Sequence, residues 1–311
     1  MAWWKPICTL LGCGLLFSST CERTVELDIE EPPPRLVVSS SFTLGEKVKV
    51  AVSKSQYILD SGLPEYIANA TVTLYEGEDL IEALGLYIDP APRIPPYYVT
   101  QHFEPQPGNT YTVKVEAPGF ATVMAHSYIP ESVPFSHLKV FDFTTEAAEE
   151  SFAVNYAYQV RLNYDDPPSE DNYYHLNLFQ AINDYTLGES GDTIVLSTRL
   201  VRLPIAFPHP EVVNDLVIGG LLFKNNPSPD GFIFDIAISG IVPEFEYLGD
   251  VVAELRTVTR EYYLYYSTFS RQQGQSDGPF NDPIVIFNNI ENGHGYFAGY
   301  NAIKDSVSLG F

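Results

Sequence analysis

One stretch of the sequence has the residue types and spacing of a nucleophilic catalyst. Gly274, Ser276 and Gly278 fit the pattern Gly-x-Ser-x-Gly, and Asp282 and His294 follow in the order found in α/β-hydrolases. That chemistry requires a strand before the serine and a helix after it, on a parallel sheet. The sequence predicts a helix before the motif and a proline-containing loop after it. We therefore interpret the motif as a solvated turn and expect no catalytic residue and no enzymatic activity, with a serine hydrolase as the less favoured alternative.

The residues that bind metal ions are scattered along the chain. The six histidines include no pair with the spacing of a zinc-binding helix, and the acidic residues do not follow the spacing of an EF-hand loop. His175 alternates with the apolar Leu176 in an expected strand, which predicts that the imidazole faces solvent. We expect neither a metal site nor a bound cofactor.

Cys21 is positioned for lipid modification. A cation at Lys5, an apolar run over residues 7–17 and the small residues 18–20 precede it, which is the order of a secretory signal. The thiol of a first mature cysteine can carry a diacylglyceryl group, and a further acyl chain makes the anchoring stable. We expect residues 1–20 to be a lipoprotein signal peptide and Cys21 to be the lipid attachment site. The alternatives are an ordinary signal peptide with a cysteine here by chance, and a spanning helix, for which the apolar run is too short.

The composition limits the partners. The chain has 17 basic and 40 acidic residues and a net charge of −23, so it repels phosphate backbones and we expect no nucleic-acid partner. The same charge disfavours peripheral binding to anionic lipid, which leaves the lipid anchor as the expected membrane attachment. The three cysteines all lie within the first 21 residues, so the mature chain has no cysteine pair for an internal disulfide. Its stability must come from a hydrophobic core, for which about 290 residues suffice.

Residues 21–34 have the composition of a tether. Acidic residues follow the cysteine, and three consecutive prolines at 32–34 end the segment, which favours an extended spacer. Acidic residues directly after a lipidated cysteine resemble a signal for export to the cell surface, and a solvated leader without such a signal is the alternative. We expect a protein that is anchored by lipid to an envelope membrane of a Gram-negative cell, with the cell-surface and periplasmic leaflets both left open.

Short runs of period-two alternation predict an all-β fold. From residue 36 apolar and polar residues alternate in runs bounded by Gly, Pro or Asn, without helical periodicity. Residues 107–115 contain a turn followed by Tyr111 and an alternating run, as in an immunoglobulin-like sandwich, where a tyrosine braces the corner. We expect residues 35–131 to form an immunoglobulin-like β-sandwich. The proline-rich residues 85–107 predict an irregular loop outside the core.

Residues 135–311 are expected to form a second β-rich domain, after a boundary within residues 129–134. The longest alternation of the chain, 152–162, predicts a strand. A turn at 165–168 predicts that residues 173–179 return beside this strand as a hairpin.

One short helix and two further strands are expected in this second domain. Thr259 is suited to cap the helix, Glu261 lies in its first turn, and Gly274 ends it. The strands are expected at residues 232–238 and 307–311.

Aromatic side chains are abundant, with 21 tyrosines and 19 phenylalanines. Tyrosines cluster at 97–98, 173–174 and 262–266, where they could form a platform for sugar rings or a peptide. Strand-rich cores also use tyrosine heavily, and we assign most of these residues to core or half-buried positions. Tyr97 and Tyr98 lie in the predicted proline-rich loop, and we expect them to contact a partner.

Four stretches of the chain resemble the lipoprotein family catalogued as domain of unknown function 4249. They are residues 21–38, 108–130, 164–174 and 261–297. The last is the most specific, with Glu-Tyr-Tyr at 261–263 followed by Pro-Phe-Asn-Asp-Pro-Ile-Val-Ile and Asn-Asn-Ile-Glu-Asn-Gly-His-Gly-Tyr-Phe. The family usually has an apolar residue where this chain has His294.

The resemblance implies an outer-membrane lipoprotein that accompanies a TonB-dependent transporter, and it supplies no reaction, ligand or site residue beyond Cys21. We therefore expect a protein that acts by binding, as an accessory to a TonB-dependent nutrient importer, with Tyr97 and Tyr98 at the contact with a TonB-dependent receptor. A surface structural or adhesive lipoprotein, or a glycan-binding one, is the alternative.

Overall fold

The computed structural model describes most of the chain. The described residues are 32–57, 62–91, 94–148, 152–167, 171–224, 233–275 and 284–309. Cys21, the predicted signal peptide and Ser276 lie outside them, so the predictions for these residues stay predictions. Residues Pro34–Phe311 form one compact unit. Within the described part, no helix is long and apolar enough to span a membrane.

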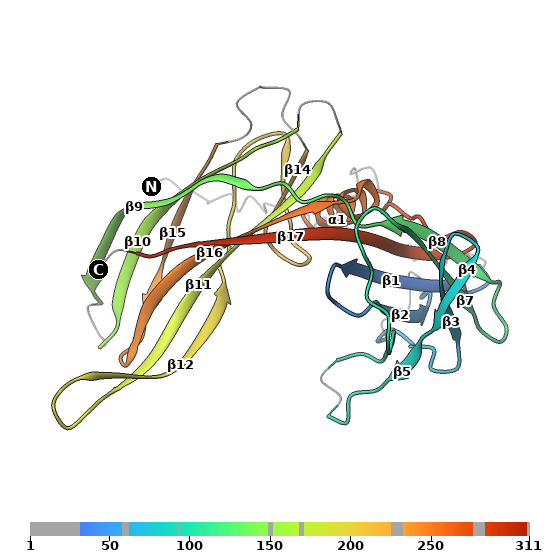
Figure 1. Cartoon of the computed structure of the whole chain (residues 1–311), viewed down its shortest axis with the longest axis horizontal. Coiled ribbons are helices and arrows are strands. Elements are labelled where there is room, and N and C mark those ends of the chain that lie inside the picture. Colours follow the sequence, from blue (N-terminus) through green and yellow to red (C-terminus); the bar gives the residue numbers. More distant parts are fainter. Residues whose placement is uncertain are drawn as a thin grey trace, which may run out of the picture. The chain divides into compact units, whose positions relative to one another are not determined.

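A large sheet passes through the whole of this unit. Among the described residues it has ten strands, in the order β13-β14-β11-β16-β17-β1-β2-β6-β5 with β12 beside β11 (Figure 1). The bounds of these strands are β1 Leu36–Thr43, β2 Lys49–Lys54, β5 Gly85–Tyr87, β6 Tyr97–Val99, β11 Tyr173–Leu187, β12 Thr193–Arg202, β13 Val212–Asn214, β14 Leu221–Lys224, β16 Glu246–Val258 and β17 His294–Val307.

Two smaller sheets pack against the large one in the described part of the chain. Their strand orders are β15-β10-β9 and β4-β3-β7-β8. The bounds are β3 Thr71–Glu76, β4 Asp79–Ala83, β7 Thr110–Glu116, β8 Val123–Tyr128, β9 Phe135–Ala147, β10 Val154–Tyr164 and β15 Phe234–Val242. The predicted all-β class is confirmed, and the strand expected at residues 232–238 corresponds to β15.

Strand β17 joins the two halves of the large sheet. Residues from His294 to Tyr300 pair in parallel with β1, and residues from Tyr300 to Val307 pair antiparallel with β16. Parallel strands must be joined by a long crossover connection, and here strands β2 to β16 lie between β1 and β17 in the sequence. The strand predicted at residues 307–311 is not formed at residues 308 and 309, because β17 already ends at Val307, and residues 310 and 311 lie outside the described residues.

Two hydrophobic cores lie on the same face of β17. One lies between the β15-β10-β9 sheet and strands β11 and β16, and the other lies between the β4-β3-β7-β8 sheet and strands β1, β2 and β6. Phe297 packs in the second core and Ile303 against the first. These two residues share a face because side chains alternate along a strand. The division into domains 35–131 and 135–311 stays a prediction, and β17 contributes side chains to both regions.

Helix α1, Arg260–Gln273, covers the opposite face of the large sheet. Its N-cap is Thr259, whose side chain accepts the backbone N–H of Tyr262, and Gly274 follows its last turn, as predicted. Tyr262 and Tyr266 pack against side chains of β14, β16 and β17. The tyrosines of the helix are therefore core residues, not an exposed platform.

The predicted hairpin between residues 152–162 and 173–179 is wrong. Strand β10 pairs with β9 and β15, whereas β11 pairs with β12, β14 and β16, so the two strands lie in different sheets. Tyr164 and Tyr174 pack between these sheets with ring centroids 4.8 Å apart, and both are buried. The crossing buries apolar surface on both strands, which a hairpin within one sheet would leave open.

The predicted irregular loop at residues 85–107 contains strands β5 and β6. Tyr98 in β6 is only 3% exposed; its hydroxyl accepts the N–H of Ala70 and donates to the carbonyl of Ile67, both at 2.9 Å. The ring is therefore hidden in the core, and the predicted partner contact at Tyr98 is wrong. Prolines flank this short strand without interrupting it, which is why the composition misled the prediction.

The predicted tyrosine brace is confirmed. The hydroxyl of Tyr111 accepts the N–H of Gln106 at 2.8 Å, and the ring is buried at the start of β7. The immunoglobulin-like topology of residues 35–131 stays a prediction.

Candidate binding site

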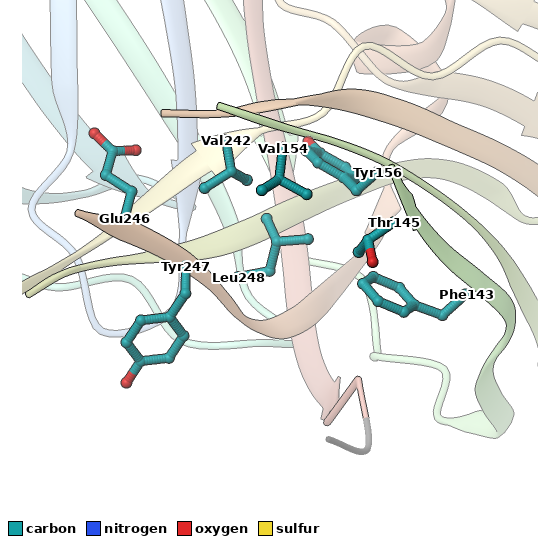
Figure 2. A pocket seen from close by; sticks show the side chains of 8 residues that line it. All are labelled: Phe143, Thr145, Val154, Tyr156, Val242, Glu246, Tyr247 and Leu248. Atoms are coloured by element: carbon teal, nitrogen blue, oxygen red, sulfur yellow. The ribbon is translucent and has the colours of Figure 1, made fainter. Parts of the chain in front are cut away.

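An open apolar pocket lies where the β15-β10-β9 sheet meets the start of β16. Its volume is about 420 Å³, and its lining residues are Phe143, Thr145, Val154, Tyr156, Val242, Glu246, Tyr247 and Leu248. These side chains come from four strands, β9, β10, β15 and β16. Figure 2 shows how they lie around the pocket. Because most of the lining is hydrocarbon, the pocket is suited to an apolar group of a ligand or partner.

Tyr156 forms one wall of the pocket. Its register partner on β15 is Gly240, and a Cβ atom there would lie 2.5 Å from the tyrosine hydroxyl oxygen. The absence of a side chain at Gly240 thus makes room for the tyrosine ring across β15. Burial raises the pKa of Tyr156, so its phenol stays protonated and can donate a hydrogen bond.

A turn between β15 and β16 positions the opposite wall. Phe245 has a φ of 67°, in the left-handed region that a bulky residue adopts only with strain. Its carbonyl accepts the N–H of Tyr185 at 2.9 Å, which ties the turn to β11. The next two residues, Glu246 and Tyr247, begin β16 and line the pocket.

The polar rim of the pocket is bonded to strand β12. Arg199 of β12 lies 2.6 Å from the carboxylate of Glu246 and 2.5 Å from that of Asp184. Exposed ion pairs of this kind add little to stability. These ion pairs instead fix a position, because they hold Arg199, and with it strand β12, next to the pocket rim.

Strand β12 is an exposed sheet edge. All ten residues of Thr193–Arg202 are exposed, and the strand pairs with β11 alone among the described strands (Figure 1). Its exposed apolar residues are Ile194, Val195, Leu196, Leu200 and Val201, with Leu196 66% exposed. Native edge strands are usually short, charged or covered, because free backbone groups recruit further strands. In the sequence, residues 194–196 are three consecutive apolar residues, and nothing in this pattern indicates that they are exposed.

The face of β11 that helix α1 covers carries a buried polar network. His175 is fully buried, so the prediction that it faces solvent is wrong. Its Nε2 lies 2.7 Å from the carbonyl of Gly219 and must donate to it, so Nδ1 accepts from the Tyr262 hydroxyl at 3.0 Å. Arg256 in turn donates to the Tyr262 hydroxyl at 3.2 Å. Alternation assigned His175 to the second face of the strand correctly, but the helix covers that face.

Asp215 closes the network. Its Oδ1 accepts the Ser270 hydroxyl and the N–H of Val217, each at 2.8 Å, while Oδ2 is buried without a hydrogen-bond partner, 3.6 Å from His175 Nε2. Burial raises the pKa of Asp215. Burial, and then the charge of Arg256, lower the pKa of His175 to about 3. Since both side chains are closed to solvent, we assign this network to stability and not to substrate chemistry.

The predicted catalytic motif is only partly described. His294 is exposed at the first position of β17, whereas Ser276 and Asp282 lie outside the described residues. Within the described segments, no group of three or more His, Cys, Asp or Glu side chains could hold a metal ion. These observations leave the expectations of no enzyme activity and no metal as predictions.

Tyr97 differs from its neighbour Tyr98. It is half-buried, its ring centroid lies 5.0 Å from that of Tyr87, and the Nζ of Lys49 lies 5.9 Å from it. The partner contact predicted at Tyr97 therefore stays a prediction. The structure does not bring Tyr97 to the apolar pocket, whose lining comes entirely from β9, β10, β15 and β16.

The fold and the pocket define an all-β protein with an exposed edge strand beside an apolar cavity. The family model described as "Domain of unknown function (DUF4249)" matches residues 22–306, and the chain belongs to this family. No curated protein matches the sequence. Among solved structures, the chain is similar to the three N-terminal domains of the bacteriophage RB49 highly immunogenic outer capsid protein, Hoc, with 14% identity and a TM-score of 0.21. That match covers 72% of this chain and 63% of the Hoc chain.

Proposed function

We propose that the protein is a lipid-anchored outer-membrane lipoprotein that acts by binding, as an accessory to a TonB-dependent nutrient importer. The observation that carries the binding role is the exposed apolar edge of β12, joined to the rim of the apolar pocket through Arg199 and Glu246. An extended segment of a partner can add to such an edge through backbone hydrogen bonds. One of its apolar side chains can then enter the neighbouring pocket of about 420 Å³.

The proposed anchor complements this weak, strand-based contact. Lipid at Cys21 would hold the chain at the membrane, and a leader of about 14 residues can reach roughly 40 Å when extended. Confinement to the membrane raises the local concentration of a membrane partner, so a modest intrinsic affinity suffices.

The anchor is tested by Cys21→Ser, which removes the thiol that would carry the lipid. We expect this variant to appear in the soluble periplasmic fraction or as uncleaved precursor, whereas the unmodified chain sediments with outer membranes. Equal membrane fractions for the two chains would contradict the lipid anchor.

The importer contact is tested by site-specific photo-cross-linking in intact cells. A photoreactive residue at Leu196 on β12 should capture a TonB-dependent receptor, whereas one at Leu80 on β4, which is also well exposed, should not. Exclusive self-cross-links from Leu196 would instead support the surface structural or adhesive alternative. Cross-links to the receptor from both positions would show proximity without a specific contact at β12.

A further inference from the structure

A second pocket, of different chemistry, lies on the helix-covered face of the large sheet. Its volume is about 250 Å³, and it is lined by Glu211, Lys224, Tyr263 and Arg271. Lys224 ends β14, Arg271 lies in the last turn of α1, and Glu211 directly precedes β13. None of these residues lines the apolar pocket, so this second pocket is independent of the function proposed for β12.

Two tyrosine rings and one ammonium group are arranged together at this pocket. The rings of Tyr173 and Tyr263 have centroids 5.1 Å apart and are tilted by 36°. The Nζ of Lys224 lies 5.8 Å from each ring centroid, within the range of cation–π attraction. The ammonium is thus held near the aromatic side chains while keeping its hydrogens available for an acceptor.

The charge at this pocket differs from that of the chain as a whole. The net charge is −23, yet Lys224 and Arg271 make no ion pair with a carboxylate among the described residues. Glu211 contributes one formal negative charge against the formal positive charges of Lys224 and Arg271, so the formal net charge of the lining is +1. Such a site matches a singly charged anion, and the carboxylate of Glu211 disfavours a doubly charged phosphate.

We propose that this pocket binds a small sugar that carries one carboxylate, a hexuronic acid. The carboxylate accepts hydrogen bonds from Lys224 and Arg271, and the planar guanidinium can engage both of its oxygens. The hydroxyl groups of the sugar donate to Glu211. Tyr263 lines the pocket although it is only 5% exposed, so it offers the sugar a small apolar contact. The pocket volume of about 250 Å³ limits the ligand to the size of a monosaccharide.

The test is calorimetric titration of the full chain in detergent with sodium glucuronate, sodium acetate and glucose. We expect saturable binding of glucuronate with a dissociation constant on the order of 1 mM or below, and weaker binding of the other two compounds. Equal binding of glucose would show that the charges play no part, and equal binding of acetate would show that no sugar ring is recognised. Either result, or no binding of glucuronate, would overturn the proposal.

Substitutions identify the residues that bind. Lys224→Gln and Arg271→Gln should each weaken glucuronate binding about tenfold or more, because each removes a charged hydrogen-bond donor. Lys139→Gln, at an exposed position of β9 in a different sheet, is the matched control and should bind like the unmodified chain. All three side chains are exposed, so equal melting temperatures are expected. Undiminished binding by both pocket variants would place the ligand elsewhere and overturn the assignment.

Discussion

At the scale of residues, the ionisable side chains form a buried set and an exposed set with separate roles. His175 and Asp215 are closed to solvent beneath α1, and their hydrogen bonds fix the loop that contains Gly219 to the sheet. Arg199 lies at the surface by contrast, at the rim of the apolar pocket. A buried ionisable group must be neutral or paired to be tolerated, so we assign the buried set to stability. The exposed set, including the ion-paired Arg199, stays accessible from solvent.

Gly220 is a residue for which the fold leaves no room for a side chain. Its φ is 104°, and a Cβ atom would lie 2.5 Å from Asn177 Oδ1 and 2.6 Å from His175 Nε2. We expect Gly220→Ala to lower the free energy of unfolding by about 3 kcal/mol or more, from strain and disruption of the network. The control is Gly191→Ala, with a φ of 84° and no atom within 4 Å of the added Cβ, for which about 1 kcal/mol is expected. Urea denaturation measures both, and equal losses would contradict the proposed crowding.

His175 predicts a specific acid sensitivity. In the unfolded chain its imidazole takes up a proton near pH 6.5, whereas burial lowers its pKa in the folded chain to about 3. The unfolded state therefore binds more protons below pH 6.5, and acid reduces stability by up to about 1.4 kcal/mol per pH unit from this group. The raised pKa of Asp215 acts in the opposite direction, and Arg202 and Arg256 stay charged. The contribution of His175 begins below pH 6.5 and continues down to its folded pKa of about 3, so the range from pH 6.5 to 5 lies within it.

The matching measurement compares the unmodified chain with His175→Gln, whose amide can both donate to Gly219 and accept from Tyr262. Urea midpoints are recorded at several values between pH 6.5 and 5. The variant should be less stable at pH 7 but lose less stability on acidification. Parallel pH profiles for the two chains would show that His175 does not titrate on unfolding in this window.

At the scale of elements, one apolar surface of the large sheet is covered by α1, whereas the apolar side chains of β12 are exposed. Helix α1 covers the outer face of β14, β16 and β17 with tyrosines. Strand β12 has no such cover in the described structure and retains its apolar side chains in solvent. An exposed edge of this kind either recruits a partner or promotes aggregation.

Charged substitutions on β12 should therefore affect association without affecting the fold. The double change Leu196→Lys with Leu200→Lys alters two exposed side chains, so the free energy of unfolding should change by less than about 0.5 kcal/mol per site. Co-purification of a TonB-dependent receptor from solubilised membranes should decrease, whereas Leu80→Lys should leave it unchanged. Normal recovery of the receptor by the double variant would argue against β12 as the contact.

At the scale of the whole molecule, β17 makes the two cores depend on one another. Its residues pack with both smaller sheets, and Gly299 lies so close to the carbonyl of Tyr128 at the end of β8 that an added Cβ would overlap it. The backbones of β17 and β8 can approach in this way only because Gly299 has no side chain.

Gly299→Ala should destabilise both regions together. We expect a loss of about 3 kcal/mol or more, and hydrogen exchange should show reduced protection in β7 of one core and in β11 of the other. Gly119→Ala, at a φ of 84° with open space around the added Cβ, should have only a local effect. Loss of protection restricted to β7 would show that the two cores open independently.

The sequence by itself determined the local elements. Period-two alternation predicted β10, β7 and β15, because a strand in a packed sheet alternates between two environments. The limits of α1 followed from Thr259 and Gly274, whose side chain and backbone suit the two helix ends. The brace of Tyr111 also followed from local sequence, since the tyrosine bonds a residue only five positions away.

Only the tertiary structure decided which strands pair and which faces are covered. Alternation shows that side chains share a face but does not identify the partner strand, so the parallel pairing of β1 with β17 and the crossing from β10 to β11 were not predictable. His175 was assigned to solvent because it alternates with the apolar Leu176, and Tyr98 was assigned to a loop because prolines surround it. Helix α1 buries His175, and the core between the β4-β3-β7-β8 sheet and strands β1, β2 and β6 buries Tyr98. Tertiary structure also decided that β12 is exposed. Its apolar residues have the composition of a core strand, and they remain in solvent because no other described element packs against them.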